Sequence, residues 1–355
     1  MKIIKPTRRL IFGLFNILIL AFAISCQKQT SGHFQEEVIN LAGVNTIYDD
    51  YNSTSSVINT AFLFHFSSNR NSTGNDFDIV GSNMSIYWNI NKGTINVESF
   101  STNFAVNFLD TMFDSINTPY NELGPNSLWY NKNSISSNDT MIDLMMYAND
   151  SKGNFDIKFV YGEFIGSPNY ALTNAVSVND IGFLNTSANE LYPTFYGKEF
   201  QNNESFGHVN TEEIEKIIYC SDMEGDFDMY EVNISPTSSL IQTLLADIET
   251  NPIKLAINSD FEDKCPFVNS SLLVFASNRD GGFGGFDLYY SYFKNGGWSE
   301  PINFGDKINS EFDEYRPITV KVKGFSNNLM VFSSNRLGGM GGFDLYYAGI
   351  EQLIE

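Results

Sequence analysis

A nine-residue motif recurs five times along the chain and restricts its fold more than any other feature. The motif reads NTIYDDYNS from Asn45, NTPYNELGP from Asn117, NTSANELYP from Asn185, NSDFEDKCP from Asn258 and NSEFDEYRP from Asn309. The copies are 72, 68, 73 and 51 residues apart. Units of this length, each supplying three or four strands, are typical of β-propeller blades, because solenoid repeats are usually shorter.

The dipeptide Phe-Asp also occurs five times, each time between a short apolar run and a second extended stretch. Its aspartates are Asp78, Asp156, Asp228, Asp287 and Asp344. Glycine paired with Asn, Asp or Gly precedes the dipeptide, and such residues accept the positive φ that turns between twisted strands require. We therefore predict that these aspartates belong to a structural hairpin turn. A strand and not a helix follows the glycine runs at 281–285 and 338–342, so we interpret them as enlarged turns rather than phosphate or calcium loops.

The two ends of the repeat array complement each other. The last copy stops after LYYAGIEQLIE, whereas the preceding copy continues into GGWSEPINFG; a matching stretch, EEVINLAGVNTIYDDY, lies at residues 36–51. An N-terminal strand that completes the C-terminal blade would remove two exposed sheet edges. The sequence thus predicts an all-β propeller of five blades over residues 36–355. A sixth, degenerate blade within residues 84–115 is the alternative.

Residues 271–347, with FASNRDGGFGGFDLYY, GGWSEPINFGDKINSEFDEYRP and VFSSNRLGGMGGFDLYY, resemble the TolB-type, WD-like β-propeller repeats of OmpA-associated envelope lipoproteins. The resemblance is specific over these two copies and faint over residues 36–250. It implies an envelope protein with a propeller. Many such proteins continue into an OmpA-like peptidoglycan-binding domain, which the sequence does not contain after Glu355.

The N-terminus predicts export and lipidation. A basic head precedes the apolar stretch from Leu10 to Ile24, which is short for a membrane span. The following Ala-Ile-Ser-Cys resembles the lipobox of bacterial lipoproteins, which implies that Cys26 is acylated and becomes the first mature residue. We expect a signal peptide at 1–25, a lipidated tether at 26–35, and anchoring in the bacterial outer membrane. Whether the protein faces the periplasm or the surface stays open.

The charge of the chain restricts its partners. Its formal net charge is -21, and removal of residues 1–25, with four basic and no acidic residues, makes it -25. Such a surface repels nucleic acid, so we expect other envelope proteins or a glycan as partners besides the membrane. No cofactor and no metal site is predicted. Cys220 and Cys265 are expected to be two separate thiols, with a disulfide as the alternative.

The sixth position of the nine-residue motif is acidic in every copy: Asp50, Glu122, Glu190, Asp263 and Glu314. Rotational repetition would place these five carboxylates at one height around the central axis. We expect them to accept backbone amides of the neighbouring blade and so to lock the blades together, with cation or ligand binding as the alternative. The repeated Asn-Arg pairs at 69–70, 278–279 and 335–336 are likewise expected to form ion pairs between blades.

Catalytic signatures are scarce. The chain has three histidines, no His-Glu-x-x-His spacing and no Gly-x-Ser-x-Gly elbow. No catalytic residue is therefore assigned, and the sequence favours a non-enzymatic protein-protein interaction scaffold in the cell envelope, with inserts near 84–115 and 236–256 as binding loops. Some propellers place acidic residues at their axis to cleave glycosides. A glycan-binding or glycoside-cleaving propeller is therefore the alternative.

Overall fold

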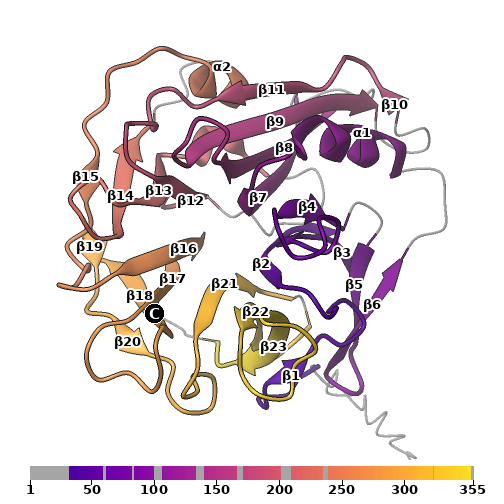
Figure 1. Ribbon diagram of the computed structural model, residues 1–355, viewed down its shortest axis with the longest axis vertical. Helices are drawn as coiled ribbons and strands as arrows, with labels where there is room; N and C mark the ends of the chain where they lie inside the picture. The colour runs from indigo at the N-terminus through magenta and orange to yellow at the C-terminus, as the bar shows by residue number, and fades with distance from the viewer. Residues whose placement is uncertain are drawn as a thin grey trace, which may run out of the picture. The chain divides into compact units, whose positions relative to one another are not determined.

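The computed structural model describes residues 32–58, 61–81, 84–99, 106–132, 140–165, 171–200, 209–234, 239–322 and 324–352. The Gly32–Glu355 unit is an all-β propeller of five antiparallel sheets that follow one another around a common centre (Figure 1). Among these residues, no helix is long and apolar enough to cross a membrane. The signal peptide and Cys26 lie outside the described residues.

Each sheet is one blade, and blades 1 to 4 are each built from a continuous stretch of the chain. Blade 1 contains β2 (Asp50–Ile58), β3 (Ala61–Ser68), β4 (Asp78–Val80), β5 (Met84–Asn89) and β6 (Thr94–Ser99). Blade 2 contains β7 (Glu122–Asn131), β8 (Thr140–Asn149), β9 (Asp156–Ile165), β10 (Ala171–Leu172) and β11 (Ser177–Asp180). Blade 3 contains β12 (Glu190–Tyr196), β13 (Lys216–Ser221), β14 (Asp228–Asn233) and β15 (Ile253–Lys254).

The last two blades repeat this order. Blade 4 contains β16 (Asp263–Asn269), β17 (Leu272–Ser277), β18 (Asp287–Lys294), β19 (Gly297–Trp298) and β20 (Ile302–Asn303). Blade 5 contains β21 (Glu314–Val320), β22 (Asn328–Ser334), β23 (Asp344–Ile350) and β1 (Ile39–Asn40). The core consists of side chains of neighbouring blades packed face to face, as in the cluster that joins Leu144 of blade 2 to Ile217 of blade 3.

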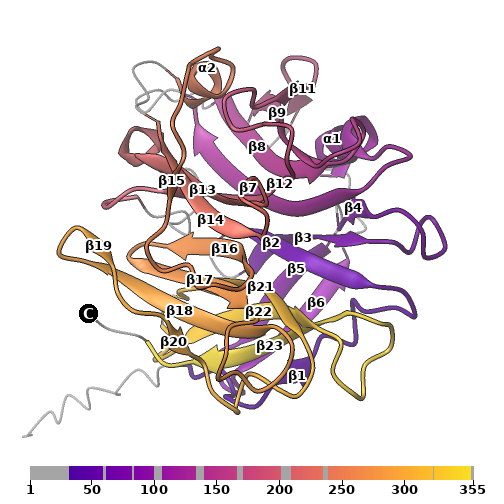
Figure 2. The same ribbon diagram turned by 60° about the vertical axis from the view of Figure 1, so that its left-hand side comes forward.

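The N-terminal strand closes the propeller, as the sequence predicts. β1 pairs with β23, with Ile39 opposite Tyr347, and Figure 2 shows the two strands side by side. The Asn40 side chain donates to Asp344 at 2.9 Å, just as Asn303 donates to Asp287 in blade 4 at 2.8 Å. The outer strand contributed by the N-terminus therefore makes the same bond as an outer strand contributed in sequence.

The chain joins the propeller before residue 36. Gly32 forms a parallel bridge with Phe325, and the Phe34 ring, which is fully buried, stacks on the Phe325 ring at 4.0 Å. The Asn327 side chain also holds both the N–H and the C=O of Phe34 at 2.8 Å. The expected boundary at residue 36 therefore falls within a segment that already packs on blade 5, because burial of Phe34 favours that arrangement.

The insert at 84–115 forms part of blade 1 and no sixth blade. Its strands β5 and β6 extend the sheet beyond β3, and the helix α1 (Val106–Ile116) packs its apolar side chains against β9 and β4. The second insert contributes a short helix, α2 (Leu240–Leu244), with Ser239 as its N-cap, and a single helical turn, η1 (Thr211–Glu213), precedes β13. The wide variation in repeat spacing thus reflects inserts of different lengths.

Candidate functional site

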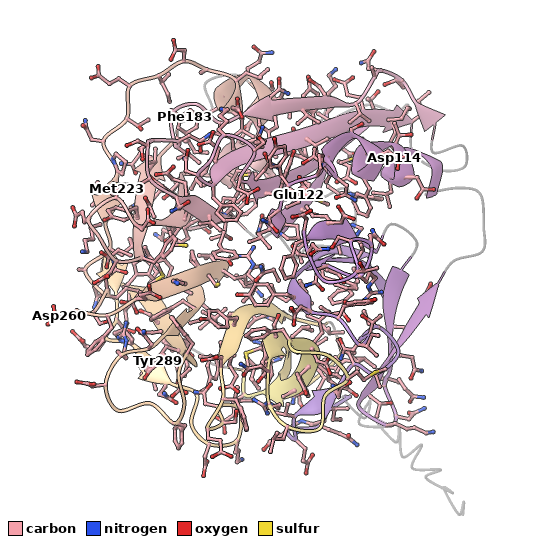
Figure 3. The ribbon with its side chains drawn as sticks, viewed as in Figure 1. Asp114, Glu122, Phe183, Met223, Asp260 and Tyr289 are labelled. Atoms are coloured by element: carbon pink, nitrogen blue, oxygen red, sulfur yellow. The ribbon has the colours of Figure 1, made fainter. Side chains whose placement is uncertain are left out.

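The five carboxylates predicted to form a ring begin the inner strands β2, β7, β12, β16 and β21 and are all fully buried. Figure 3 shows Glu122 nearer the centre of the view than Asp114 or Asp260. Each carboxylate accepts the backbone N–H and the hydroxyl of the Ser or Thr four residues earlier, at 2.5–3.3 Å. The carboxylate therefore closes the turn that leads into its own strand.

The same carboxylates bind the second strand of their own blade. Glu190 accepts from Ser221 at 3.0 Å, and Glu122 accepts from Asn149 at 2.7 Å. Glu314 accepts from Ser334 at 3.0 Å and pairs with Arg336 at 2.8 Å. The expectation that these carboxylates take amides from the neighbouring blade is therefore wrong, because residues of their own turn and blade lie closer.

The link between blades comes from other groups of the same motif. The backbone N–H of each ring residue donates to the C=O of the Phe-Asp phenylalanine in the preceding blade at 2.7–2.8 Å. The side chain of the asparagine that opens each motif makes two hydrogen bonds with the residue after Phe-Asp, at 2.7–3.1 Å. Its oxygen accepts from the backbone N–H of that residue, and its nitrogen donates to the backbone C=O. Neighbouring blades are thus joined by hydrogen bonds between backbone groups and by an asparagine side chain that both donates and accepts.

The repeated arginines also act within a blade. Arg70 pairs with Asp50, Arg279 with Asp263 and Arg336 with Glu314, each across the first two strands of one sheet. The predicted pairing between blades is therefore incorrect. Blades 2 and 3 have no arginine at this position. Burial raises the pKa of Glu122 to about 7, and it also raises the pKa of Glu190 and, despite the contact with Arg336, that of Glu314.

The hairpin aspartates order the turns between the second and third strands. Asp287 accepts the N–H groups of Phe283 and Gly284 at 2.7 and 3.1 Å, and Asp344 accepts the equivalent pair in blade 5. A Cβ on Gly284 would lie 2.1 Å from the Phe312 carbonyl oxygen. The glycine run is thus needed because the turn packs directly on the nine-residue motif of the next blade.

Asp78, Asp156 and Asp228 occupy the equivalent position in the other blades. Asp78 accepts from Asn71 at 2.8 Å, and Asp156 and Asp228 form ion pairs with Lys152 and Lys254. Each of the five aspartates therefore binds a polar group of its own turn or of the outer strand of its own blade.

A bulge in every inner strand fills the axis of the propeller. Its residues with positive φ are Asn52, Gly124, Tyr192, Cys265 and Arg316. Proline follows four of these residues, which is a signal that sequence reasoning overlooked, since proline inside a sheet marks a bulge. The two thiols, Cys220 and Cys265, are free and lie buried in one hydrophobic cluster.

Arg316 is the central group of this axis. It is fully buried, and its two terminal nitrogens donate to the carbonyls of Pro266 and Pro125 at 3.0 Å. Its guanidinium lies 5.5 Å from the centre of the Tyr192 ring. Burial lowers its pKa. One side chain of blade 5 thus contacts blades 2, 3 and 4, and the axis is occupied by protein instead of an acidic channel.

An open hollow of about 640 Å³ lies between blades 3 and 4. We call it the blade 3–4 hollow; its lining includes Tyr196, Lys198 and Glu199 from blade 3, and Ser270, Phe293 and Lys294 from blade 4. These residues lie at the ends of β12 and β18 and in the turn between β16 and β17. Because the ring residues begin those inner strands, the hollow is at the opposite end of the propeller from the ring.

The aromatic floor of the hollow consists of Tyr196, which is buried, and Phe293, and polar residues make up most of the remaining lining. Tyr196, Phe293 and Trp298 contact one another with ring centroids 5.2–5.4 Å apart. The side chains of Lys198, Glu199 and Lys294 are exposed. Burial, with the charges of Glu215 and Glu231, raises the pKa of Tyr196, so its hydroxyl stays protonated. The hollow therefore combines an apolar platform with donors and acceptors, which is the usual composition of a small-ligand site.

Comparison with known proteins returns structures only. No protein-family model matches the chain, and no curated protein matches its sequence. A GH62 hydrolase in complex with xylotriose aligns with 90% of this chain and 98% of its own, at 9% identity and a TM-score of 0.49.

Two further solved structures extend the comparison. An N-acetylgalactosamine deacetylase from F. plautii aligns with 91% of this chain and 95% of its own, at 10% identity and a TM-score of 0.47. An exo-β-1,3-galactanase from Clostridium thermocellum aligns with 90% of this chain, at 12% identity and 0.47. The chain spans only 62% of that galactanase's length.

The comparisons correct two predictions. The sequence favours a non-enzymatic scaffold, whereas the GH62 hydrolase, the deacetylase and the galactanase that align with the chain are enzymes. The expectations of a docking scaffold and of a non-enzyme are therefore withdrawn. Identities of 7–12% and TM-scores of at most 0.49 carry neither a substrate nor a reaction to this chain.

Proposed function

We propose that this propeller recognises a glycan in the blade 3–4 hollow. The observation that carries the proposal is the aromatic floor of Tyr196 and Phe293, supported by Trp298, in an otherwise polar lining. A sugar ring presents C–H groups on its faces and hydroxyl groups on its edges. The aromatic faces suit the former, and Glu199, Ser270 and the lysines suit the latter.

The shape of the hollow supports a saccharide of a few residues. Its volume of about 640 Å³ falls within the range of ligand pockets, and it is open on one side, so a longer chain could continue into solvent. Among the described residues, the buried Arg316 and Tyr192 side chains occupy the axis. The proposed site therefore differs from the axial carboxylates that the sequence suggests for a glycan-active propeller.

A glycan array followed by titration calorimetry tests this proposal on the full chain. Phe293→Ala should weaken binding of the selected oligosaccharide about tenfold or more, because it removes part of the platform. Phe283→Ala is the control, since Phe283 is also a phenylalanine of blade 4 but lies, 49% exposed, in the glycine turn at the other end. Equal loss in both variants, or no glycan binding at all, would disprove the proposal.

Hydrolysis is tested in the same preparation. Glu199 is the carboxylate in the lining of the hollow, and the Glu215 carboxylate accepts the Lys198 backbone N–H at 3.4 Å. Glycosidases generally use two carboxylic groups, one as acid and one as base or nucleophile. If the protein cleaves the glycan that it binds, Glu199→Gln should abolish release of reducing ends while leaving binding measurable.

We also propose that the protein is a lipoprotein of the bacterial outer membrane with TolB-type repeats, acylated at Cys26. The basic head, the short apolar stretch and the cysteine after small residues support this proposal. Two or more acyl chains would hold the protein stably at a bilayer. Mass spectrometry and membrane fractionation should show a lipid-modified, membrane-bound wild type and an unmodified Cys26→Ala variant. A membrane-bound, unmodified wild type would contradict acylation.

A further inference from the structure

The lysines that line the blade 3–4 hollow differ from most other lysines of the chain. The described residues include eleven lysines, of which seven form ion pairs: Lys132, Lys152, Lys158, Lys216, Lys254, Lys264 and Lys307. Among the described residues, Lys92, Lys198, Lys294 and Lys321 have no such partner. Two of these four lysines therefore lie in the same hollow.

The lack of a partner is informative because the chain is rich in carboxylates. It has 42 acidic residues against 21 basic ones. Nearby carboxylates are already engaged, since Glu231 pairs with Lys216 at 2.5 Å and Glu215 accepts the Lys198 backbone N–H. Glu199 is the one acidic residue in the lining against two lysines. Within the described lining, basic side chains therefore outnumber acidic ones, although the whole chain is acidic.

We infer that the ligand of the blade 3–4 hollow is an acidic saccharide, whose carboxylate or sulfate group lies between Lys198 and Lys294. This inference rests on the proposed function and makes it more specific. Both lysine side chains are exposed and form no ion pair with any residue that the structure describes, and a lysine binds an anionic oxygen as a compact point charge. The aromatic floor would hold the sugar ring while the lysines select its charge.

The acidic surface of the protein sharpens this selectivity. A net charge of -21 repels polyanions, so an acidic glycan is held only where the local charge is positive. Weak adsorption over the whole surface is therefore excluded as a source of binding. Salt should weaken binding, because exposed ion pairs are screened within about 8 Å at physiological ionic strength.

Calorimetry with three matched trisaccharides tests the inference. The first is a uronic acid oligomer, the second is its uncharged methyl ester, and the third has the same linkage but carries a sulfate ester in place of the carboxylates. The uronate or the sulfated sugar should bind at least about tenfold more tightly than the methyl ester, and the tighter of the two identifies the anionic group. Lys198→Gln and Lys294→Gln should each reduce that preference, and the double variant should remove it.

Lys92→Gln and Lys321→Gln are the controls, because both residues are exposed lysines without an ion pair in the described chain and neither lines the hollow. Equal affinity for charged and neutral sugars, unaffected by the lysine variants but lost in Phe293→Ala, would overturn the inference and leave the proposed function intact. Failure of all three sugars and of the array to bind would overturn both. Equal losses in the control variants would also refute a specific role for Lys198 and Lys294.

Discussion

The carboxylate ring and the blade 3–4 hollow lie at opposite ends of the propeller and differ in burial, in repetition and in the partners of their charged groups. Every ring carboxylate is buried, occurs in all five blades and is bonded to the Ser or Thr of its own turn. The hollow occurs once, is open, and contains two lysines that have no ion pair in the described residues. A side chain that recurs in all five blades is expected to stabilise the fold of each blade. A ligand site, in contrast, is expected to depend on residues that differ between blades.

This contrast also separates burial from function. Glu122 and Tyr196 both have raised pKa values because they are buried, yet Glu122 belongs to the repeated frame and Tyr196 to the hollow. A perturbed pKa therefore does not identify the site in this protein. What distinguishes the hollow is its two exposed lysines, which form no ion pair within the described part of the chain.

The largest expected effect is at the axis, where the repeated frame converges. Arg316→Ala should lower the free energy of unfolding by about 4 kcal/mol, because it leaves a cavity and deprives the Pro125 and Pro266 carbonyls of their donors. Chemical denaturation measures this loss. Arg316→Lys, which keeps the charge, should recover only part of it. A stable Arg316→Ala variant would show that the blades close without this contact.

The next effect compares ring positions with and without arginine. Glu314→Gln should cost about 3 kcal/mol, because it leaves the largely buried Arg336 without its carboxylate. Glu190→Gln should cost about 1–2 kcal/mol, because only hydrogen bonds from Thr186 and Ser221 are weakened. Thermal and urea unfolding give both values. If the two variants unfolded like the wild type but no longer bound a ligand, the ring carboxylates would belong to the functional site and not to the structural framework.

A smaller effect depends on pH. Burial raises the pKa of Glu122 from 4.5 to about 7, so the folded protein retains a proton that the unfolded chain releases near pH 4.5. The stabilising contribution of this group is complete below pH 4.5 and declines as the pH rises through 7, by about 3 kcal/mol in total. Glu122→Gln should lack this decline. Parallel pH profiles for the two proteins would contradict the assignment.

The smallest effect on stability is expected in the hollow. Lys294→Gln should change the free energy of unfolding by less than about 0.5 kcal/mol, because the side chain is exposed and has no ion pair within the described residues. The same variant should weaken binding of the acidic saccharide. A large loss of stability would show that Lys294 belongs to the structural frame, and the contrast with the ring would then fail.

Repetition made much of the fold predictable. The five copies of the motif and the match between residues 36–51 and 299–315 predict the number of blades and their closure, because rotational repeats impose the same local structure at each step. The same pattern located the ring carboxylates at the start of every inner strand. It also showed that the glycine runs are turns, since shorter copies occur in the other blades.

Partners of individual side chains were less predictable. Arg336 and Glu314 are 22 residues apart, and the sequence does not reveal whether they meet within one sheet or across two. The structure places them on adjacent strands of blade 5, because the turn before Glu314 and the end of β22 lie side by side. Phe34 similarly reads as part of a tether, whereas burial against Phe325 makes it part of the propeller.

By itself, the sequence determined the class of fold and the N-terminal closing strand and favoured five blades over six, since these follow from local patterns repeated along the chain. The tertiary structure alone decided the number of blades, what fills the axis and where the blade 3–4 hollow forms. Arg316 reaches carbonyls 50 and 191 residues away, and the hollow joins Tyr196 to Phe293 across two blades. Such contacts depend on how non-equivalent residues meet after the propeller closes, and no repeated pattern encodes them.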